Sequence, residues 1–175
     1  IWYLFACKGI DLLKNNAGIL TFIAQNNWVT SYGASKMRNK VIQDTRIVNL
    51  VDFCDYKIFE SADIQTMIMI LQRDSKGDNY SFDYRRLTEK EANFEDMLNL
   101  LYKETISKSE FLKPTIQRKD FLDKTLTFSH LENEKMLNKI SQQSNFKLTE
   151  KEVAQGIVFP QDFVNKESQK ILGDK

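Results

Sequence analysis

The stretch Gly18-Ile-Leu-Thr-Phe-Ile-Ala-Gln-Asn26-Asn-Trp28 decides the fold. Residues 18–24 form a short and nearly continuous apolar run, which predicts a strand buried on both faces, as in a parallel sheet. Upstream, apolar residues recur at roughly helical spacing over residues 2–14. Asn15, Asn16 and Gly18 then predict the end of that helix and a turn into the strand.

Two further strands and one helix follow from the sequence downstream of this stretch. Ser31 is a candidate cap for a helix over residues 31–44, with Ala34, Met37 and Val41 on one face. Residues 46–53 and 65–72 favour strands, and residues 54–63 between them are irregular. Because this connection is too short for a helical crossover, we expect the last two strands to be antiparallel. Residues 1–73 therefore predict the closing half of an open α/β sheet.

After residue 73 the pattern changes to a mostly helical α+β segment. Residues 74–79 predict a turn, and residues 80–87 a hairpin partner for the preceding strand. Helices are expected over residues 89–104 and 130–143, with short strands or loops over 107–128. Three capping boxes support these helix starts and one more near the C-terminus: Thr88 with Glu91, Ser129 with Glu132, and Thr149 with Glu152.

Composition excludes several classes of site and gives no independent sign of nucleic-acid binding. Two cysteines and one histidine cannot complete a zinc site of four Cys/His ligands. Cys7 and Cys54 are expected to be buried, reduced thiols of a cytoplasmic protein, and His130 a surface residue. Lys and Arg balance Asp and Glu in both halves of the chain, 8 against 7 over residues 1–74 and 17 against 17 over 75–175. No apolar stretch approaches the roughly 20 residues of a membrane span.

Residues 12–72 resemble the adenine-N6 DNA methyltransferases. Leu12-Leu13-Lys14, the Gly18–Trp28 stretch and the helix after Ser31 are similar to the passage between the fourth and fifth strands of that family. Residues 51–71 look like its next strand, a loop ending in Phe, and its antiparallel final strand. The order of the elements is that of the Type IIG restriction–modification enzymes and their Taq-type relatives, in which cofactor motifs come first and target recognition last. The resemblance thus implies a methyltransferase-type, Rossmann-like sheet.

The resemblance also implies a role for the loop aromatic. Methylation of an exocyclic adenine nitrogen requires the base to leave the helix, and an extruded base stacks on aromatic side chains. By position, Phe59 matches the stacking residue of the family. Asn26 and Trp28 follow a strand's carboxyl end, where open α/β sheets bind ligands. They are candidate DNA contacts, as is Lys57 in the Phe59 loop, although core packing is the alternative for Trp28.

The parts of the family that perform methyl transfer are missing from this sequence. The transfer motif, Asp or Asn followed by Pro-Pro and Tyr or Phe, is absent, as is the glycine-rich loop that holds S-adenosylmethionine. We therefore expect part of a larger prokaryotic enzyme whose chemistry lies elsewhere. This part alone should neither methylate double-stranded DNA nor bind the cofactor, and it holds no metal.

Residues 74–175 correspond to the family only by position, as the start of a target-recognition or linking region. Arg85 and Arg86 are candidate phosphate contacts there, and Arg118 and Lys119 are weaker ones, because scattered basic residues usually form a solvated surface. A boundary is expected between residues 73 and 74. The sequence does not decide whether the parent also carries a nuclease.

A second hypothesis remains open: a non-enzymatic α/β module that binds DNA or a protein partner through the helices of residues 89–175. In either case a half-sheet exposes an apolar strand edge. We expect the chain to self-associate through that edge, or to cover it with its own C-terminal helices.

Overall fold

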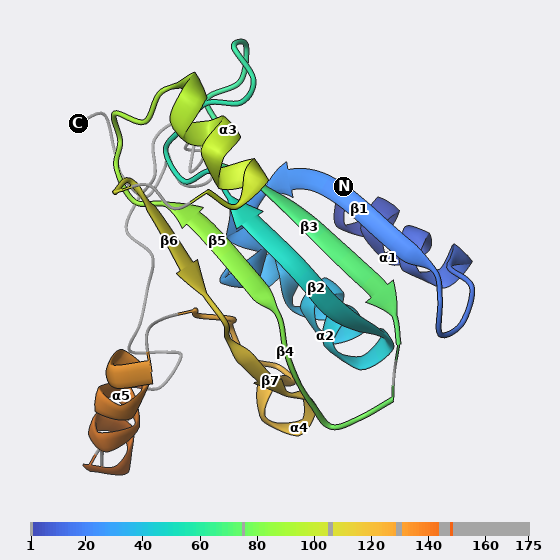
Figure 1. The fold of residues 1–175 in the computed structure, drawn as a ribbon. Coiled ribbons are helices and arrows are strands. Elements are labelled where there is room, and N and C mark those ends of the chain that lie inside the picture. The colour runs from blue at the N-terminus through green and yellow to red at the C-terminus, as the bar shows by residue number, and fades with distance from the viewer. Residues whose placement is uncertain (1, 75, 105–106, 129–130, 144–147, 149–175) are drawn as a thin grey trace, which may run out of the picture. The chain divides into compact units, whose positions relative to one another are not determined.

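The computed structural model describes residues 2–74, 76–104, 107–128, 131–143 and 148 (Figure 1). Contacts divide the chain into two units, residues 1–134 and 135–175. Every described strand and all but the last described helix lie wholly in the first unit. Within the described residues, no helix is long and apolar enough to cross a membrane.

The first unit is built on a five-stranded mixed sheet with the order β1-β3-β2-β5-β6. Its strands are β1 (Ile19–Gln25), β3 (Thr66–Arg73), β2 (Thr45–Asp52), β5 (Asp83–Leu87) and β6 (Ser109–Leu112). All pairs are antiparallel except β2 with β5. The predicted antiparallel arrangement of β2 and β3 is thus confirmed, and β3 lies between β1 and β2.

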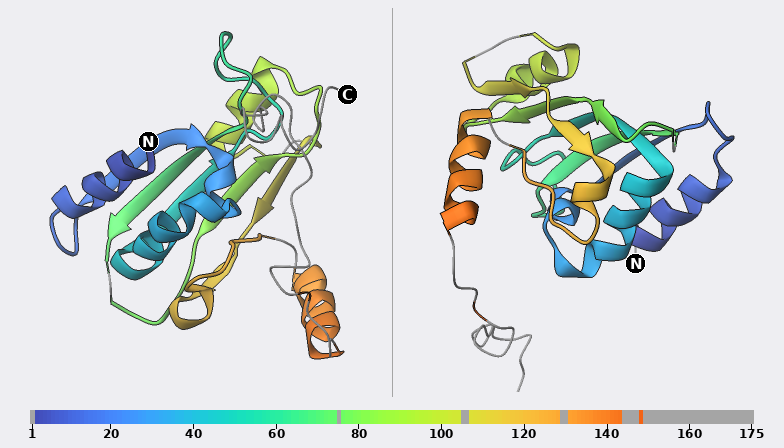
Figure 2. Two further views of the ribbon diagram at one scale, coloured as in Figure 1. Left: turned by 180° about the vertical axis from the view of Figure 1, so that it is seen from behind. Right: turned by 90° about the horizontal axis from the view of Figure 1, so that it is seen from below.

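Two helices cover one face of this sheet, α1 (Trp2–Leu12) and α2 (Ser35–Asp44), as Figure 2 shows. Short 3-10 turns η1 (Asn26–Val29) and η2 (Tyr32–Ala34) connect β1 to α2. The core on this face includes Met67, Met69 and Leu71 of β3 and the fully buried Trp28, Val41, Ile47 and Leu50. The alternation along β3 directs every second side chain to this core.

The opposite face carries α3 (Phe94–Tyr102) over the carboxyl ends of β2 and β5 (Figures 1 and 2). Met97 and Leu100 of α3 form a second apolar cluster with Val51, Phe53 and Leu87. Asn93 caps the helix, and a reciprocal bond from the Asn93 amide to Asp96 completes a capping box.

A small second sheet and a short helix complete the first unit. Strand β4 (Asn79–Ser81) pairs with β7 (Thr115–Gln117), and α4 (Arg118–Phe121) follows directly. The remaining described helix, α5 (Leu131–Gln143), presents Met136, Leu137 and Ile140 as exposed apolar side chains.

The structure corrects three local predictions in residues 1–91. β1 is an edge strand with one open face, because Ile19 and Ile23 are 60% and 41% exposed, so it is not buried on both sides. Ser31 does not cap α2, which begins at Ser35 after η2. Thr88 does not cap α3 either, because its N–H continues the β5–β6 pairing by bonding to the Lys108 carbonyl.

The predicted hairpin of residues 80–87 with the preceding strand is also wrong. Both edges of β3 are occupied, by β1 and β2, so the chain after residue 73 passes to the free edge of β2. The boundary expected after residue 73 consequently falls inside the sheet, which β5 and β6 extend. The predicted helix over residues 130–143 is present as α5, whereas the caps at Ser129 and Thr149 and the placement of His130 lie outside the described residues.

Candidate functional site

The candidate site lies where β1 and β2 end, at the edge of the sheet beside α3 (Figure 1). Two connections leave the sheet there: η1 after β1, and the loop of residues 53–65 between β2 and β3. The loop projects beyond the strand ends in Figure 1. Carboxyl ends of strands are the usual place of ligand sites in open α/β sheets.

Phe59 stands on this loop with 42% of its surface exposed. Two neighbouring loop residues, Tyr56 and Ile58, pack against the apolar cluster beneath α3. A turn closed by the Ala62 N–H and the Phe59 carbonyl, at 3.3 Å, follows directly. The loop is thus anchored by its apolar neighbours while the ring of Phe59 stays accessible, which is the arrangement that a stacking platform needs.

A polar network joins the strand ends beneath the loop. The Asn26 side-chain amide donates to Asp52 Oδ1 at 3.0 Å, and the Tyr84 hydroxyl donates to Asp52 Oδ2 at 3.2 Å. The backbone N–H of Cys54 also donates to Asp52 Oδ1, at 2.9 Å. Asp52 itself is only 7% exposed. Its three partners are all donors, so both carboxylate oxygens of Asp52 act as acceptors.

An open hollow of about 210 Å³ lies beside this network. Residues from both connections line it: Gln25, Asn26, Asn27, Asp63, Ile64 and Gln65. Amide groups dominate this lining, and Asn and Gln amides can bond to the edges of adenine. The hollow and Phe59 therefore share one loop at one end of the sheet.

Two charged or titratable groups of the loop are tied down locally. Lys57, a predicted DNA contact, forms an exposed ion pair with Asp63 at 2.9 Å. Burial, with the neighbouring Asp52 charge as a smaller cause, raises the pKa of Cys54 to about 12. The thiol is therefore protonated at neutral pH and is a poor nucleophile.

The other predicted contacts are engaged inside the fold. Trp28 is fully buried, so its indole packs in the core and does not form part of the exposed site. The Arg85 guanidinium donates to the carbonyls of Leu100 and Leu101 at 3.3 and 2.9 Å, which fastens the end of α3 to β5. Arg86 forms a cross-strand ion pair with Glu110.

The two weaker candidates, Arg118 and Lys119, differ: the first is engaged inside the fold and the second is exposed. Arg118 is 9% exposed and, among the described residues, its hydrogen bonds go to backbone carbonyls, whereas Lys119 is exposed and lies 3.6 Å from Asp78. Of the predicted set, the structure therefore gathers Asn26, Lys57 and Phe59 at one end of the sheet. Arg85 and Arg86 form bonds within the fold, and their contact with DNA stays a prediction.

The residues that the sequence reasoning missed are Asp52 and Tyr84. A strand ending in Leu50-Val-Asp52 does not show which partners its carboxylate will meet, and these lie 26 and 32 residues away. The only hint is an acidic residue at the end of an otherwise apolar strand, where burial demands hydrogen-bond partners.

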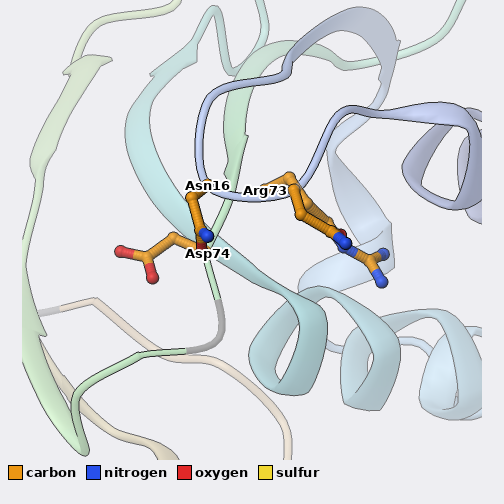
Figure 3. Close-up of a pocket in the computed structure, with 4 residues that line it drawn as sticks. Asn16, Arg73 and Asp74 are labelled. Atoms are coloured by element: carbon orange, nitrogen blue, oxygen red, sulfur yellow. The ribbon is translucent and has the colours of Figure 1, made fainter.

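A second hollow, of about 220 Å³, lies at the other end of β3 and is lined by Asn15, Asn16, Arg73 and Asp74 (Figure 3). Figure 3 shows that the Arg73 guanidinium and the Asp74 carboxylate point away from one another. Arg73 bonds to the Ile10 carbonyl and Asp44, and Asp74 accepts the N–H of Lys76. These groups do not converge on a ligand. Among the described residues there is also no cluster of side chains that could hold a metal ion.

Comparison with known proteins bears on the first part of the chain. Residues 1–59, about a third of the sequence, match the model of the Eco57I restriction-modification methylase family. The match thus runs from α1 through η1, α2 and β2 to Phe59. No curated protein matches the chain.

Solved structures of restriction–modification proteins are similar in backbone to larger parts of the chain. A modification subunit of a putative type I restriction enzyme from Vibrio vulnificus aligns over 63% of this chain and 27% of its own, with TM-score 0.48 and 15% identity. The type IIG restriction endonuclease BpuSI aligns over 70% and 15%, with TM-score 0.49 and 10% identity. The EcoKI M protein aligns over 73% and 39%, with TM-score 0.43 and 10% identity. The chain therefore spans less than two fifths of the length of these proteins.

Proposed function

We propose that this chain is part of a restriction–modification DNA methyltransferase of the adenine-N6, Taq-type class, and that it supplies one wall of the pocket for the extruded adenine. The main support for this proposal is the position of Phe59, an exposed aromatic residue on an anchored loop at the carboxyl end of the sheet. The family match over residues 1–59 supports the restriction–modification assignment. In this proposal the whole enzyme acts on double-stranded DNA in a prokaryotic cytoplasm.

The Phe59 ring would replace the stacking partners that the adenine loses when it leaves the duplex. A base that leaves the duplex loses its stacking partners, and a flat aromatic surface replaces them at roughly 1–3 kcal/mol per base. The amide-lined hollow offers hydrogen-bonding groups beside that surface. Lys57, Arg85 and Arg86 remain the predicted phosphate contacts in this proposal, and each of them also has a partner within the fold: Asp63, the Leu101 carbonyl and Glu110 respectively.

S-adenosylmethionine would be the methyl donor, but the residues present do not form its site. A dinucleotide-type or methyl-donor site needs a glycine-rich turn directly after a strand. Among the described residues, Gly9 lies in α1, Gly18 precedes β1, Gly33 lies in η2, and Gly77 stands alone in the turn after β3. The cofactor is therefore assigned to other parts of the enzyme.

Replacing Phe59 with alanine tests the proposal in the methyltransferase that contains this chain. Loss of the stacking surface should reduce kcat/KM for DNA methylation by roughly 5- to 150-fold, equivalent to 1–3 kcal/mol. Phe59→Trp should restore most of the activity, because any flat ring can stack. Methyl incorporation into a DNA duplex with the recognition site measures both.

Phe94→Ala is the matched control, because Phe94 is also an exposed aromatic, at 64%, but lies on α3. It should leave methylation unchanged. An equal loss in both variants, or none for Phe59→Ala, would contradict the proposal. So would a gene that encodes no Asp/Asn-Pro-Pro-Tyr/Phe motif within about 200 residues upstream of this segment.

Self-association through the free edge of β1 is a second part of the proposal. Among the described strands β1 pairs only with β3, so within the described part of the chain its other edge, next to Ile19 and Ile23, is unpaired. Sedimentation velocity on the isolated chain should show a mass that rises with concentration. Thr21→Lys on β1 should shift it toward monomer, and Val48→Lys on the interior strand β2 should not. A monomer at all concentrations would contradict this.

A further inference from the structure

Asp52 is a buried carboxylate that no ion pair explains. It is 7% exposed, and within the described part of the chain it forms no salt bridge. Its hydrogen bonds come instead from an amide, a hydroxyl and a backbone N–H, at 2.9–3.2 Å. A buried polar group of this kind is strongly tied to one geometry, because every unmade bond in the interior is costly.

The three donors belong to three different segments of the site. Asn26 is the first residue after β1, Cys54 lies at the start of the Phe59 loop, and Tyr84 lies on β5. Since β3 lies between β1 and β2, the Asn26–Asp52 bond spans the end of β3. The side chain of Asp52 thus joins the ends of β1 and β2, which do not pair directly, and adds a bond to Tyr84 of β5, which already pairs with β2.

The backbone conformation at Cys54 shows why the Phe59 loop depends on its hydrogen bond to Asp52. Cys54 has φ of +49°, a left-handed conformation that costs a residue with a side chain free energy. Its N–H reaches back to Asp52 Oδ1 in this conformation. The bond therefore holds the turn through which the chain leaves β2 toward Tyr56 and Phe59.

We infer that Asp52 is a positioning residue: it fixes the first turn of the Phe59 loop relative to Asn26 and thereby sets where the Phe59 ring stands. The functional meaning of that position rests on the function proposed above. The carboxylate is too buried to touch a base, so it acts through Asn26 and the loop.

Asp52→Asn tests the positioning in the full 175-residue chain without DNA. Trypsin cleavage after Lys57 requires the loop to open, because the next residue, Ile58, is packed. This cleavage should accelerate about tenfold or more relative to cleavage after the exposed Lys119, since proteolysis follows the population of the opened loop. Alkylation of Cys54 by iodoacetamide at pH 8 should rise by a similar factor, because burial and the Asp52 charge both suppress the thiolate.

Glu60→Gln is the matched control, because it removes a negative charge from the same loop at an exposed position. It should leave both rates unchanged. Tyr84→Phe removes one donor and keeps the carboxylate, so it should give a smaller increase of about two- to fivefold. It also keeps the test decisive if Asp52→Asn does not fold. Wild-type rates in both Asp52→Asn and Tyr84→Phe would overturn the inference. So would an equal acceleration after Lys57 and Lys119.

The methylation activity of the enzyme gives a second measurement, whose result differs if Asp52 has only a general structural role. If Asp52 acts through Phe59, Asp52→Asn should lower methylation in the normal enzyme and have little further effect in the Phe59→Ala background. Additive losses would overturn the link to Phe59. The proteolysis result stands whether or not Phe59 stacks on a base, so failure of the proposed function and failure of the positioning are separate outcomes.

Discussion

Replacing Arg118 with methionine should lower the free energy of unfolding by about 3–5 kcal/mol. The guanidinium is buried and donates to backbone carbonyls, at 2.9 Å to Gly77, 2.7 Å to Asp74 and 2.8 Å to Thr45, and also to Ile42. Methionine would remove the Arg118 donors from these carbonyls, and each buried group left unsatisfied costs about 1–3 kcal/mol. Urea denaturation followed by the fluorescence of the buried Trp28 measures the change.

Lys119→Met is the control for this prediction. Lys119 is the next residue, but its side chain is 82% exposed and forms an ion pair with the exposed Asp78 at 3.6 Å. Its replacement should change the free energy of unfolding by no more than about 0.5 kcal/mol. If Arg118→Met cost less than about 1 kcal/mol, the buried bonds of Arg118 would not be the means by which the turn after β3 is held to α2.

Arg118, like Arg85 and Arg86, shows which side-chain contacts could not be predicted from the sequence. In sequence, Arg85, Arg86 and Arg118 resemble any surface arginine. Their partners lie 15 to 76 residues away and exist only when the sheet has formed. Whether an arginine meets solvent, a carboxylate or a helix end is thus a property of the tertiary fold, which is why the bonds of Arg85 and Arg86 within the fold could not be predicted from the sequence.

The elements of residues 1–73 were predictable for a local reason. Their strands are short apolar runs bounded by polar or turn residues, and their helices have a clear apolar face, so each segment carries its own signal. The antiparallel β3 followed from the length of one connection. Phe59 and Asn26 could be placed at the sheet's end because both follow directly from where strands stop.

Residues 74–117 were harder because their partners are distant in sequence. The Leu-Thr-Glu-Lys-Glu segment at 87–91 has a good capping signal, yet Leu87 and Thr88 pair with β6, and the helix begins after Asn93. A strand pairing with remote partners outweighed a local preference here. The same holds for β5, whose place beside β2 depends on both edges of β3 being occupied.

Replacing Phe53 with alanine should lower the free energy of unfolding by about 3–5 kcal/mol. Phe53 is 1% exposed and packs in the cluster that joins β2 and β5 to α3. Truncation leaves a cavity under α3, while the backbone bond from Phe53 N–H to the Thr66 carbonyl, at 3.0 Å, can remain. Chemical denaturation of the isolated chain measures this loss.

The same substitution at Phe59 separates packing from function. Phe59 lies six residues later and is 42% exposed, so Phe59→Ala should change the free energy of unfolding by no more than about 0.5 kcal/mol. A small change would mean that the fold does not depend on this ring, which leaves the ring available for the stacking role proposed above. A stability loss above about 1 kcal/mol in Phe59→Ala would instead make Phe59 a packing residue of the loop, and the stacking role would lose its structural support.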